Sequence, residues 1–208
     1  MNLEKEKQEV ASFMRRLYEK GLTTCSGGNV SQRIESVVVI TPSQIDKAYI
    51  EANQIAEIEM DGKNLTPYLK PSMETAMHLA VYNARPDVKA IVHAHPITAT
   101  AFATTNKEIN CRLTGETRAI IGIPANAPYA LMGTQTLAEK VAETATKNAN
   151  VILMENHGII CFGESLLMAF DRLEVLEAAA KATLITHLLG DKKEIPQQDL
   201  NEIDKLFS

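Results

Sequence analysis

The sequence predicts a single α/β domain, spanning residues 1–208, with helices on both faces of a β-sheet. Short β-branched runs alternate with longer segments whose apolar residues recur at helical spacing. Residues 54–65 alternate apolar and polar side chains around Asp61-Gly62, a hairpin signal that argues against an all-parallel sheet. The composition, 45% hydrophobic and 23% charged, is typical of a soluble globular protein, and no linker or repeat divides the chain.

The first third of the chain contains one clear helix and one clear strand. Residues 6–20 form an amphipathic pattern that Gly21 ends, as expected of a helix closed by a left-handed residue. Residues 23–31 are rich in glycine and hydroxyl side chains and predict a loop. Residues 36–43 predict a buried strand that ends in a turn.

The remaining elements follow in alternation. Ser72 is expected at the start of a helix within residues 70–85. The elements predicted after it are a strand (87–95), a short helix (96–105), a strand with a loop (120–133), a helix (134–148), a strand entering a tight turn (149–158), a strand (159–163) and a long helix (164–190) ending at Gly190.

Charge and cysteine content exclude several classes of protein. The net charge of -5, without a basic stripe, argues against nucleic-acid and anionic-membrane partners. No apolar run approaches the roughly 20 residues that span a bilayer. The charged N-terminus has no apolar core, so no signal peptide is expected. Cys25, Cys111 and Cys161 form no CxxC pair, and we expect reduced thiols in a cytoplasmic protein.

Two histidines one residue apart indicate a metal site. His93 and His95 follow an apolar strand pattern, and alternation places both side chains on one face. His157 lies just beyond another predicted buried strand, and Glu74 opens the helix that leads into the His93 strand. Three imidazoles and one carboxylate suit a catalytic zinc ion or another divalent ion.

Each of these residues also has a structural interpretation. His157 could cap the turn before Gly158, and Glu74 could simply be favoured by the positive end of its helix. Glu74 and His78 are four residues apart on one helix face, so spacing alone allows either as the ligand. His187, on the last long helix, is interpreted as structural.

Glycines and hydroxyls at three places predict an anion site. The stretch "CSGGNVS", residues 25–31, can direct successive backbone amides at one anion. "TPS" and "KPS" add Ser43 and Ser72 at an apparent strand end and helix start. Neither GxxxxGK[ST] nor a strand-linked GxGxxG occurs, so no nucleotide site is expected.

The ordered set "SGGNVS", "TPS", "KPSMETAMHLAVY", "AIVHAHP", "APYALMGTQTLAE" and "ENHGII" resembles the class II aldolase/adducin family over about residues 5–190. The resemblance implies a three-layer α/β/α fold with a mixed, largely antiparallel sheet. It also implies a homotetramer with active sites at subunit interfaces. It assigns one Zn²⁺ per subunit to Glu74, His93, His95 and His157, and the substrate phosphate to Ser26, Gly28, Asn29, Ser43 and Ser72.

The activity that the resemblance implies is cleavage of a ketose 1-phosphate, L-fuculose 1-phosphate first, to dihydroxyacetone phosphate and a short aldehyde such as L-lactaldehyde. Fucose catabolism would then be its context, and Glu74 would be the acid–base residue. Epimerases, dehydratases and decarboxylases share the fold. The epimerases typically have aspartate where Glu74 stands, which favours the aldolase. Adducin-like interaction modules lack the metal ligands and fit less well.

Three positions depart from the family pattern. Gln44 stands where a glycine is usual, and Met73 where a second serine is usual. Leu113 lies near the place of the catalytic tyrosine of the sugar-phosphate aldolases. Tyr129 and Glu116 are therefore the candidates for the missing acid.

Overall fold

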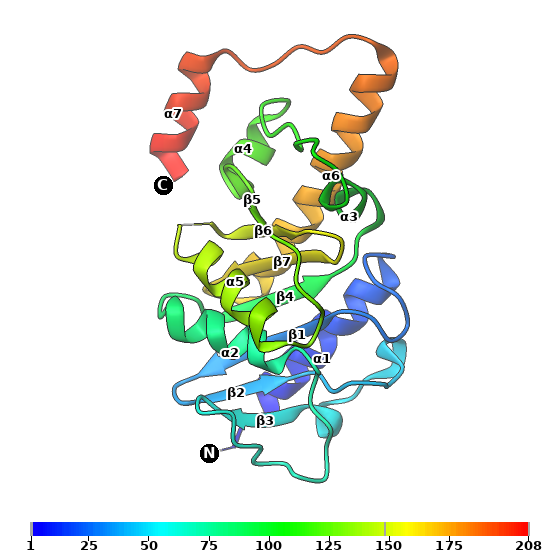
Figure 1. The fold of residues 1–208 in the computed structure, drawn as a ribbon, viewed down its shortest axis with the longest axis vertical. Coiled ribbons are helices and arrows are strands. Elements are labelled where there is room, and N and C mark those ends of the chain that lie inside the picture. Colours follow the sequence, from blue (N-terminus) through cyan, green and yellow to red (C-terminus); the bar gives the residue numbers. More distant parts are fainter. Residues whose placement is uncertain (1, 148, 208) are drawn as a thin grey trace.

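A computed structural model describes residues 2–147 and 149–207, and a seven-stranded sheet forms its centre (Figure 1). Along the sheet the strands run in the order β3-β2-β1-β4-β7-β6-β5. Only β5 and β6 are parallel, and every other neighbouring pair is antiparallel. The mixed, largely antiparallel sheet is thereby confirmed. The strands are β1 (Asn29–Ile34), β2 (Val37–Ile40), β3 (Ala56–Glu59), β4 (Ala90–Ala94), β5 (Ala125–Ala127), β6 (Val151–Met154) and β7 (Gly158–Gly163).

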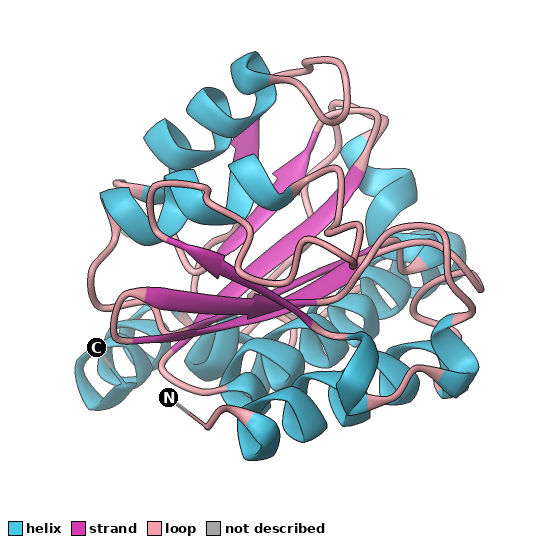
Figure 2. Ribbon diagram, turned by 90° about the horizontal axis from the view of Figure 1, so that it is seen from below, coloured by secondary structure: helices cyan, strands magenta, loops and turns pink. Residues whose placement is uncertain are grey.

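Helices cover both faces of this sheet, as Figure 2 shows. One layer consists of α1 (Glu4–Glu19), α3 (Ile97–Ala103) and α6 (Leu166–Leu189), and the other of α2 (Thr75–Ala84) and α5 (Gln135–Ala145). At the end of the molecule that holds the C-terminus, α4 (Gly115–Ile121) packs against α6 and α7 (Gln197–Phe207) (Figure 1). Two short 3₁₀ turns, Lys47–Tyr49 and Ala52–Gln54, precede β3.

Alternate residues of the strands supply two separate cores. In β4, Val92 packs into the core under α1, α3 and α6, whereas Ile91 packs into the core under α2 and α5. His93 follows Ile91 at the strand period, so its side chain lies on the α2 face. The sheet thus presents an imidazole, fully buried, to the helix that Glu74 begins.

Several boundaries differ from the sequence predictions. The loop expected over residues 23–31 gives way to β1 at Asn29, because β1 pairs with both β2 and β4 despite its polar sequence. The hairpin expected over 54–65 keeps its turn, but the segment after the turn forms no second strand. It pairs with β3 at a single bridge, between Ile58 and Asn64. Helices α4 and α7 were not predicted, and residue 148 of the helix predicted over 134–148 lies outside the described residues.

No helix in the described part of the chain combines the length and apolar character that a membrane span requires.

Candidate active site

Three histidine side chains meet at one end of the sheet. His93 belongs to β4, His95 follows that strand, and His157 lies in the turn between β6 and β7. Because β4 pairs with β7 and Ala94 lies opposite Ile159, this turn is brought beside the end of β4. One ring nitrogen from each histidine lies within 4.8 Å of the others. Three imidazole nitrogens this close can hold one ion.

Gly158 makes room for this arrangement. A Cβ atom there would collide with Cδ2 of His95 and lie 2.8 Å from the carbonyl oxygen of Ala94. Only glycine therefore lets the His95 ring lie across the turn that carries His157. The "NHG" sequence is explained by this close approach as well as by the turn itself.

Glu74 lies between two of the histidines. Glu74 is the N-cap residue of α2, and its carboxylate oxygen Oε2 lies 3.1 Å from Nε2 of His93. The other oxygen, Oε1, lies 3.0 Å from Nε2 of His157. On its opposite side, the His93 ring uses Nδ1 to donate to the carbonyl oxygen of Ile159 at 2.8 Å. This bond fixes the tautomer and leaves the Nε2 lone pair of His93 free for a metal.

The buried atoms of this cluster fit a divalent cation. Glu74 Oε1, His93 Nε2 and His157 Nε2 are buried, and none has a hydrogen-bond partner among the described residues, although they lie about 3 Å from a neighbouring cluster atom. Buried polar atoms without partners are costly, typically about 1–3 kcal/mol each. A cation shared by these atoms would satisfy all of them. Nitrogen with carboxylate oxygen suits zinc and similar divalent ions.

Burial and neighbouring charges set the protonation of the cluster. Burial alone would raise the pKa of the Glu74 carboxyl, but the imidazoles of His93 and His157 outweigh it and hold the pKa below its ordinary value. Burial, with the charges of His93 and His157, lowers the pKa of His95 to about 3. Glu74 is therefore ionised and His95 neutral at pH 7, the forms in which they can bind a metal.

His78 is not part of this cluster. Its ring is fully buried, with Nε2 2.5 Å from Oδ1 of Asn29 and Nδ1 2.7 Å from Oγ of Ser31. Burial and the charge of His93 lower the pKa of His78 to about 3. Both ring nitrogens are thus occupied by hydrogen bonds. Of the two residues that helical spacing allowed as ligands, Glu74 is the one that the fold directs at the histidines.

A cavity of about 260 Å³ opens beside the cluster. All five residues expected to bind the phosphate line it, together with Glu74, His95 and His157: Ser26, Gly28, Asn29, Ser43 and Ser72. Gln44 and Met73, the two departures from the family pattern, line it too. Lys47, Lys70 and Met132 also line the cavity, and no sequence pattern predicted them there. No local pattern marks Lys47, since lysine is almost never fully buried without a partner.

Gly28 brings the loop before β1 against β4. Its φ is +65°, and a Cβ atom there would lie 2.7 Å from the carbonyl oxygen of His93. Any other residue would push this loop away from the histidines. The cavity and the metal cluster are therefore joined by a backbone contact that requires glycine.

The two candidates for the missing acid lie elsewhere. Glu116 is in the first turn of α4, and Tyr129 follows β5, where its backbone N–H donates to Glu155 Oε2 at 2.9 Å. Both side chains are exposed, and neither is among the described residues that line the cavity. One chain alone does not bring either group to the metal cluster.

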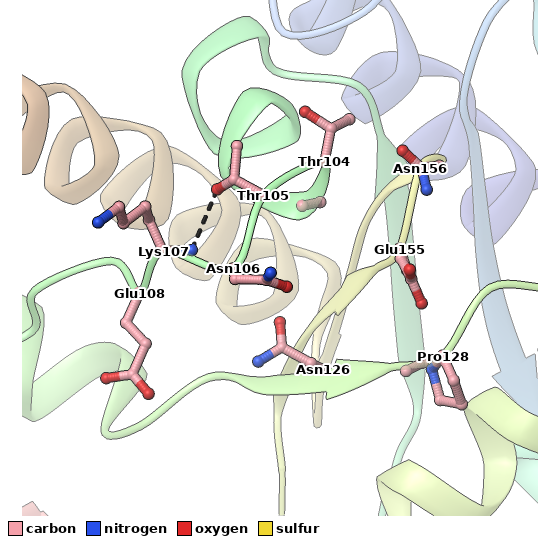
Figure 3. A pocket seen from close by; sticks show the side chains of 11 residues that line it. Thr104, Thr105, Asn106, Lys107, Glu108, Asn126, Pro128, Glu155 and Asn156 are labelled. Atoms are coloured by element: carbon pink, nitrogen blue, oxygen red, sulfur yellow. Dashed lines mark hydrogen bonds between the residues drawn. The ribbon is translucent and has the colours of Figure 1, made fainter.

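A second cavity of about 450 Å³ shares the turn that carries His157. Figure 3 shows Glu155 and Asn156 on one side of it, with Asn126 and the segment from Thr104 to Glu108 around them. Its lining contains none of the clustered histidines. The chemistry-bearing groups thus gather in the smaller cavity.

Comparison with known proteins agrees with this geometry. Residues 8–184 match the family model of the class II aldolase and adducin N-terminal domain. L-fuculose phosphate aldolase from Methanocaldococcus jannaschii is 35% identical over 184 residues, which cover 88% of this chain and 98% of that protein. 5-deoxy-D-ribulose 1-phosphate aldolase from Bacillus thuringiensis serovar kurstaki is 30% identical over 212 aligned positions, covering 100% and 97% of the two chains.

A solved structure has the same fold. An L-fuculose 1-phosphate aldolase superposes with a TM-score of 0.88 at 31% identity, covering 97% of this chain and 95% of the other. Aldolases of this class are metal-dependent lyases, and the His93, His95 and His157 cluster supplies a site for such a metal. The chain therefore belongs to the class II aldolase/adducin family.

Proposed function

We propose that the protein is a zinc-dependent aldolase that cleaves a ketose 1-phosphate between C3 and C4. The products are dihydroxyacetone phosphate and a short aldehyde. The observation that carries the proposal is the Glu74 carboxylate, held 3.1 Å from His93 and 3.0 Å from His157 at the edge of a cavity lined with serine hydroxyls and lysines. One Zn²⁺ per subunit would be held by His93, His95 and His157, with Glu74 as the fourth ligand.

The reaction needs a proton donor or acceptor at C3. As the C3–C4 bond breaks, the C4 hydroxyl loses its proton, C4 becomes the aldehyde carbon, and the electron pair stays on C3 as an enediolate. A bound divalent ion would supply Lewis-acid stabilisation of that negative charge. A proton added at C3 then completes dihydroxyacetone phosphate, and we propose that the Glu74 carboxylate takes up this proton from solvent and passes it to C3. Its Oε1 is buried and has no hydrogen-bond partner in the described structure, so it remains available.

Hydrogen bonds around Ser43 and Ser72 support a binding site for the substrate phosphate in this part of the cavity (the phosphate seat). Oγ of Ser43 accepts from the backbone N–H of Met73 at 3.0 Å, and Oγ of Ser72 accepts from that of Glu74 at 3.2 Å. Each serine uses its oxygen as an acceptor, so its hydroxyl hydrogen can donate to an anion. The seat therefore offers donors although Met73 replaces a serine.

Two lysines add positive charge to this seat. Lys47 is 1% exposed, and its Nζ donates to the carbonyl oxygen of Pro42, while Nζ of Lys70 donates to Gln44 Oε1 at 3.2 Å. No carboxylate pairs with Lys47 within the described residues. A buried, unpaired ammonium group favours a dianionic phosphate beside it.

Two substrates share the part of the molecule that the seat would bind. L-fuculose 1-phosphate would give dihydroxyacetone phosphate and L-lactaldehyde, which would place the enzyme in fucose catabolism. 5-deoxy-D-ribulose 1-phosphate, the substrate in the name of a relative aligned over the whole chain, would give the same phosphate and acetaldehyde. The two differ by one CHOH group beyond C4, so the same metal and phosphate contacts serve both.

We further propose a homotetramer with active sites at subunit interfaces. The proposal offers an acceptor for the proton of the C4 hydroxyl: Tyr129 and Glu116 of a neighbouring subunit are the candidates, since one chain brings neither into the cavity. Exposed apolar side chains on α3, α6 and α7, including Ile97, Leu189 and Phe207, are consistent with further contacts. Sedimentation of the active protein tests this: a fully active monomer would contradict it.

The free thiols of Cys25, Cys111 and Cys161 support a reducing, cytoplasmic location. Subcellular fractionation of the native host, followed by immunodetection of the protein, tests this proposal. Recovery in a secreted or periplasmic fraction would contradict it.

A substrate screen tests the proposed activity. The zinc-loaded protein is mixed with ketose 1-phosphates, including both candidates, and release of dihydroxyacetone phosphate is followed. We expect release that a chelator abolishes and added zinc restores. Protein that holds stoichiometric zinc yet releases no dihydroxyacetone phosphate from any of them would overturn the proposal. Assays for CO₂ release, epimer formation and dehydration then distinguish the other activities of the fold.

A further inference from the structure

A buried hydrogen-bonded chain runs between α2 and β1 and ends at Glu74. Glu74, His78 and Tyr82 recur every four residues on one face of α2, and Asn29 and Ser31 recur every two residues on one face of β1. Four helical residues rise about 6 Å and two strand residues about 6.6 Å. The two rows of side chains therefore have nearly the same spacing, and they alternate along the interface between α2 and β1.

The contacts link all five residues in order. Tyr82 OH lies 2.8 Å from Ser31 Oγ, and Ser31 Oγ lies 2.7 Å from His78 Nδ1. His78 Nε2 lies 2.5 Å from Asn29 Oδ1, and Asn29 Nδ2 donates to Glu74 Oε2 at 2.8 Å. Every one of these side chains is buried.

The direction of each bond follows from the carboxylate. An ionised Glu74 can only accept, so the Asn29 amide must direct its NH₂ group at Oε2 and its oxygen at His78. That oxygen can also only accept, so the His78 proton is on Nε2. The neutral ring then accepts at Nδ1 from the Ser31 hydroxyl, which leaves the Ser31 oxygen to accept from Tyr82. Only one assignment of hydrogens satisfies the whole chain.

We propose that Tyr82, Ser31, His78 and Asn29 are positioning residues that hold the Glu74 carboxylate in one orientation. Their bond to Oε2 leaves Oε1 as the oxygen free for the reaction. The inference rests on the proposed function for its catalytic consequence, but the arrangement itself belongs to the protein without substrate. Asn29, which lines the cavity, thus acts on Glu74 as well as on any ligand.

A packing role alone would not require this chemistry. The surrounding core on the α2 face is apolar, and apolar side chains of similar volume could fill the interface. If the Asn29 amide turned over, its oxygen would face Oε2 of Glu74, and two acceptors would oppose each other. The tautomer of His78 prevents this, so the position of a proton on a ring outside the three-histidine cluster controls the orientation of the acid–base group.

The His78 tautomer is the direct test, and it requires neither metal nor substrate. Long-range ¹H–¹⁵N correlation spectra of the metal-free protein show which ring nitrogen carries the proton. We expect neutral His78 protonated at Nε2 from pH 5 to 8. A ring protonated at Nδ1, or at both nitrogens, would overturn the proposal.

Variants test the consequence for Glu74. Ser31→Ala removes the donor to Nδ1, so we expect a second tautomer to appear and proton exchange at C3 of dihydroxyacetone phosphate to slow roughly tenfold, a loss typical of one buried hydrogen bond. Zinc affinity and the KM for dihydroxyacetone phosphate should change less than twofold. Thr144→Val removes a buried hydroxyl from α5, which bonds only within its helix, and should change neither readout.

A folded Ser31→Ala protein with wild-type ring signals and wild-type exchange would also overturn the proposal. If Ser31→Ala does not fold, Tyr82→Phe removes the terminal hydroxyl at nearly constant volume, and His78 ring signals that do not move in it contradict the chain. Absence of exchange in the wild type would instead count against the proposed function, while the tautomer measurement would still decide the role of the chain.

Discussion

The two ends of the cavity are built differently. At the metal end, His93 lies in a strand buried on both faces, and its ring is fixed by the backbone of the neighbouring strand. At the other end, where we propose that the phosphate binds (the phosphate end), Ser26 and Ser43 lie on loops and are more exposed. Under the proposed function, one metal ligand is therefore fixed within the rigid sheet, whereas two of the phosphate-binding residues lie on loops whose side chains can change.

The departures from the family pattern follow this division. Gln44 and Met73 both line the phosphate end, whereas the metal end keeps all four expected residues. Gln44 retains a left-handed backbone, with φ +59°, so the turn keeps its path while the side chain differs. A change at the metal end would leave buried polar atoms without partners, and a change on the loops need not.

Loss of a metal ligand should have the largest effect. His93→Ala should lower zinc affinity by at least about 100-fold, more than loss of an outer-shell partner usually costs, and activity should be lost with it. Elemental analysis and cleavage assays on the same preparation measure both. His187→Ala, an exposed histidine on α6, is the matched control and should retain both. Active His93→Ala protein without metal would contradict the metal site.

A change at the phosphate end should affect binding and not chemistry. Lys47→Met should raise the KM for a ketose 1-phosphate by about 10–100-fold, the range for a lost charged hydrogen bond, with little change in kcat. Lys89→Met, at an exposed lysine, is the control. Proton exchange into unphosphorylated dihydroxyacetone should be unaffected, and an equal loss on both ligands would show that Lys47 does not serve the phosphate.

The pKa of Lys47 gives the same prediction a pH dependence. Burial lowers this pKa to about 8, so the ammonium group loses its charge as the pH rises through that value. KM for the phosphorylated substrate should therefore rise above about pH 8 in the wild type. In Lys47→Met that rise should be absent, and its persistence would assign it to another group.

His78 should make the metal-free protein sensitive to acid. Its pKa is lowered to about 3 in the folded state from an ordinary 6.5, so below pH 6.5 the unfolded chain binds a proton that the folded chain does not. The free energy of unfolding should fall as the pH drops from 6.5 toward 3, by up to about 1.4 kcal/mol per pH unit for this group. Urea unfolding of His78→Gln should show a shallower slope, and an unchanged slope would contradict the buried neutral ring.

Gln44→Gly should have the smallest effect. Glycine adopts the left-handed backbone without strain, so the free energy of unfolding should rise by about 1 kcal/mol or less. Glu35→Gly, at φ +52° in the β1–β2 turn, should stabilise the protein similarly. KM should change only for Gln44→Gly, because Gln44 alone of the two lines the cavity. An equal KM change in both would show that the effect is global.

The metal end could be predicted from the sequence because its signals are local. Strand alternation placed His93 and His95 on one face, and a strand end placed His157. Spacing alone left Glu74 and His78 as equal candidates. Their difference depends on Asn29, whose strand appeared to be a loop because its inward face is polar and Asn29 itself pairs with His93, which is far from it in the sequence.

The features that the sequence did not predict depend on long-range packing. Lys47 is buried by segments far from it in the chain, and nothing local distinguishes it from a surface lysine. Helix α7 has apolar residues at helical spacing but buries only Leu200, and the Arg118–Asp204 ion pair joins it to α4, far from it in the chain. The partner for the C4 proton would come from another subunit, which no pattern in one chain can place.

The most direct test of the account is Glu74→Gln, measured by solvent deuterium exchange at C3 of dihydroxyacetone phosphate. This exchange needs the base and the metal but no aldehyde, and glutamine keeps the volume and one ligand oxygen while losing basicity. We predict that the variant retains zinc and exchanges roughly 10²–10⁴-fold more slowly than the wild type. Exchange at the wild-type rate with zinc bound would show that another residue is the base, with Tyr129 and Glu116 the next to test.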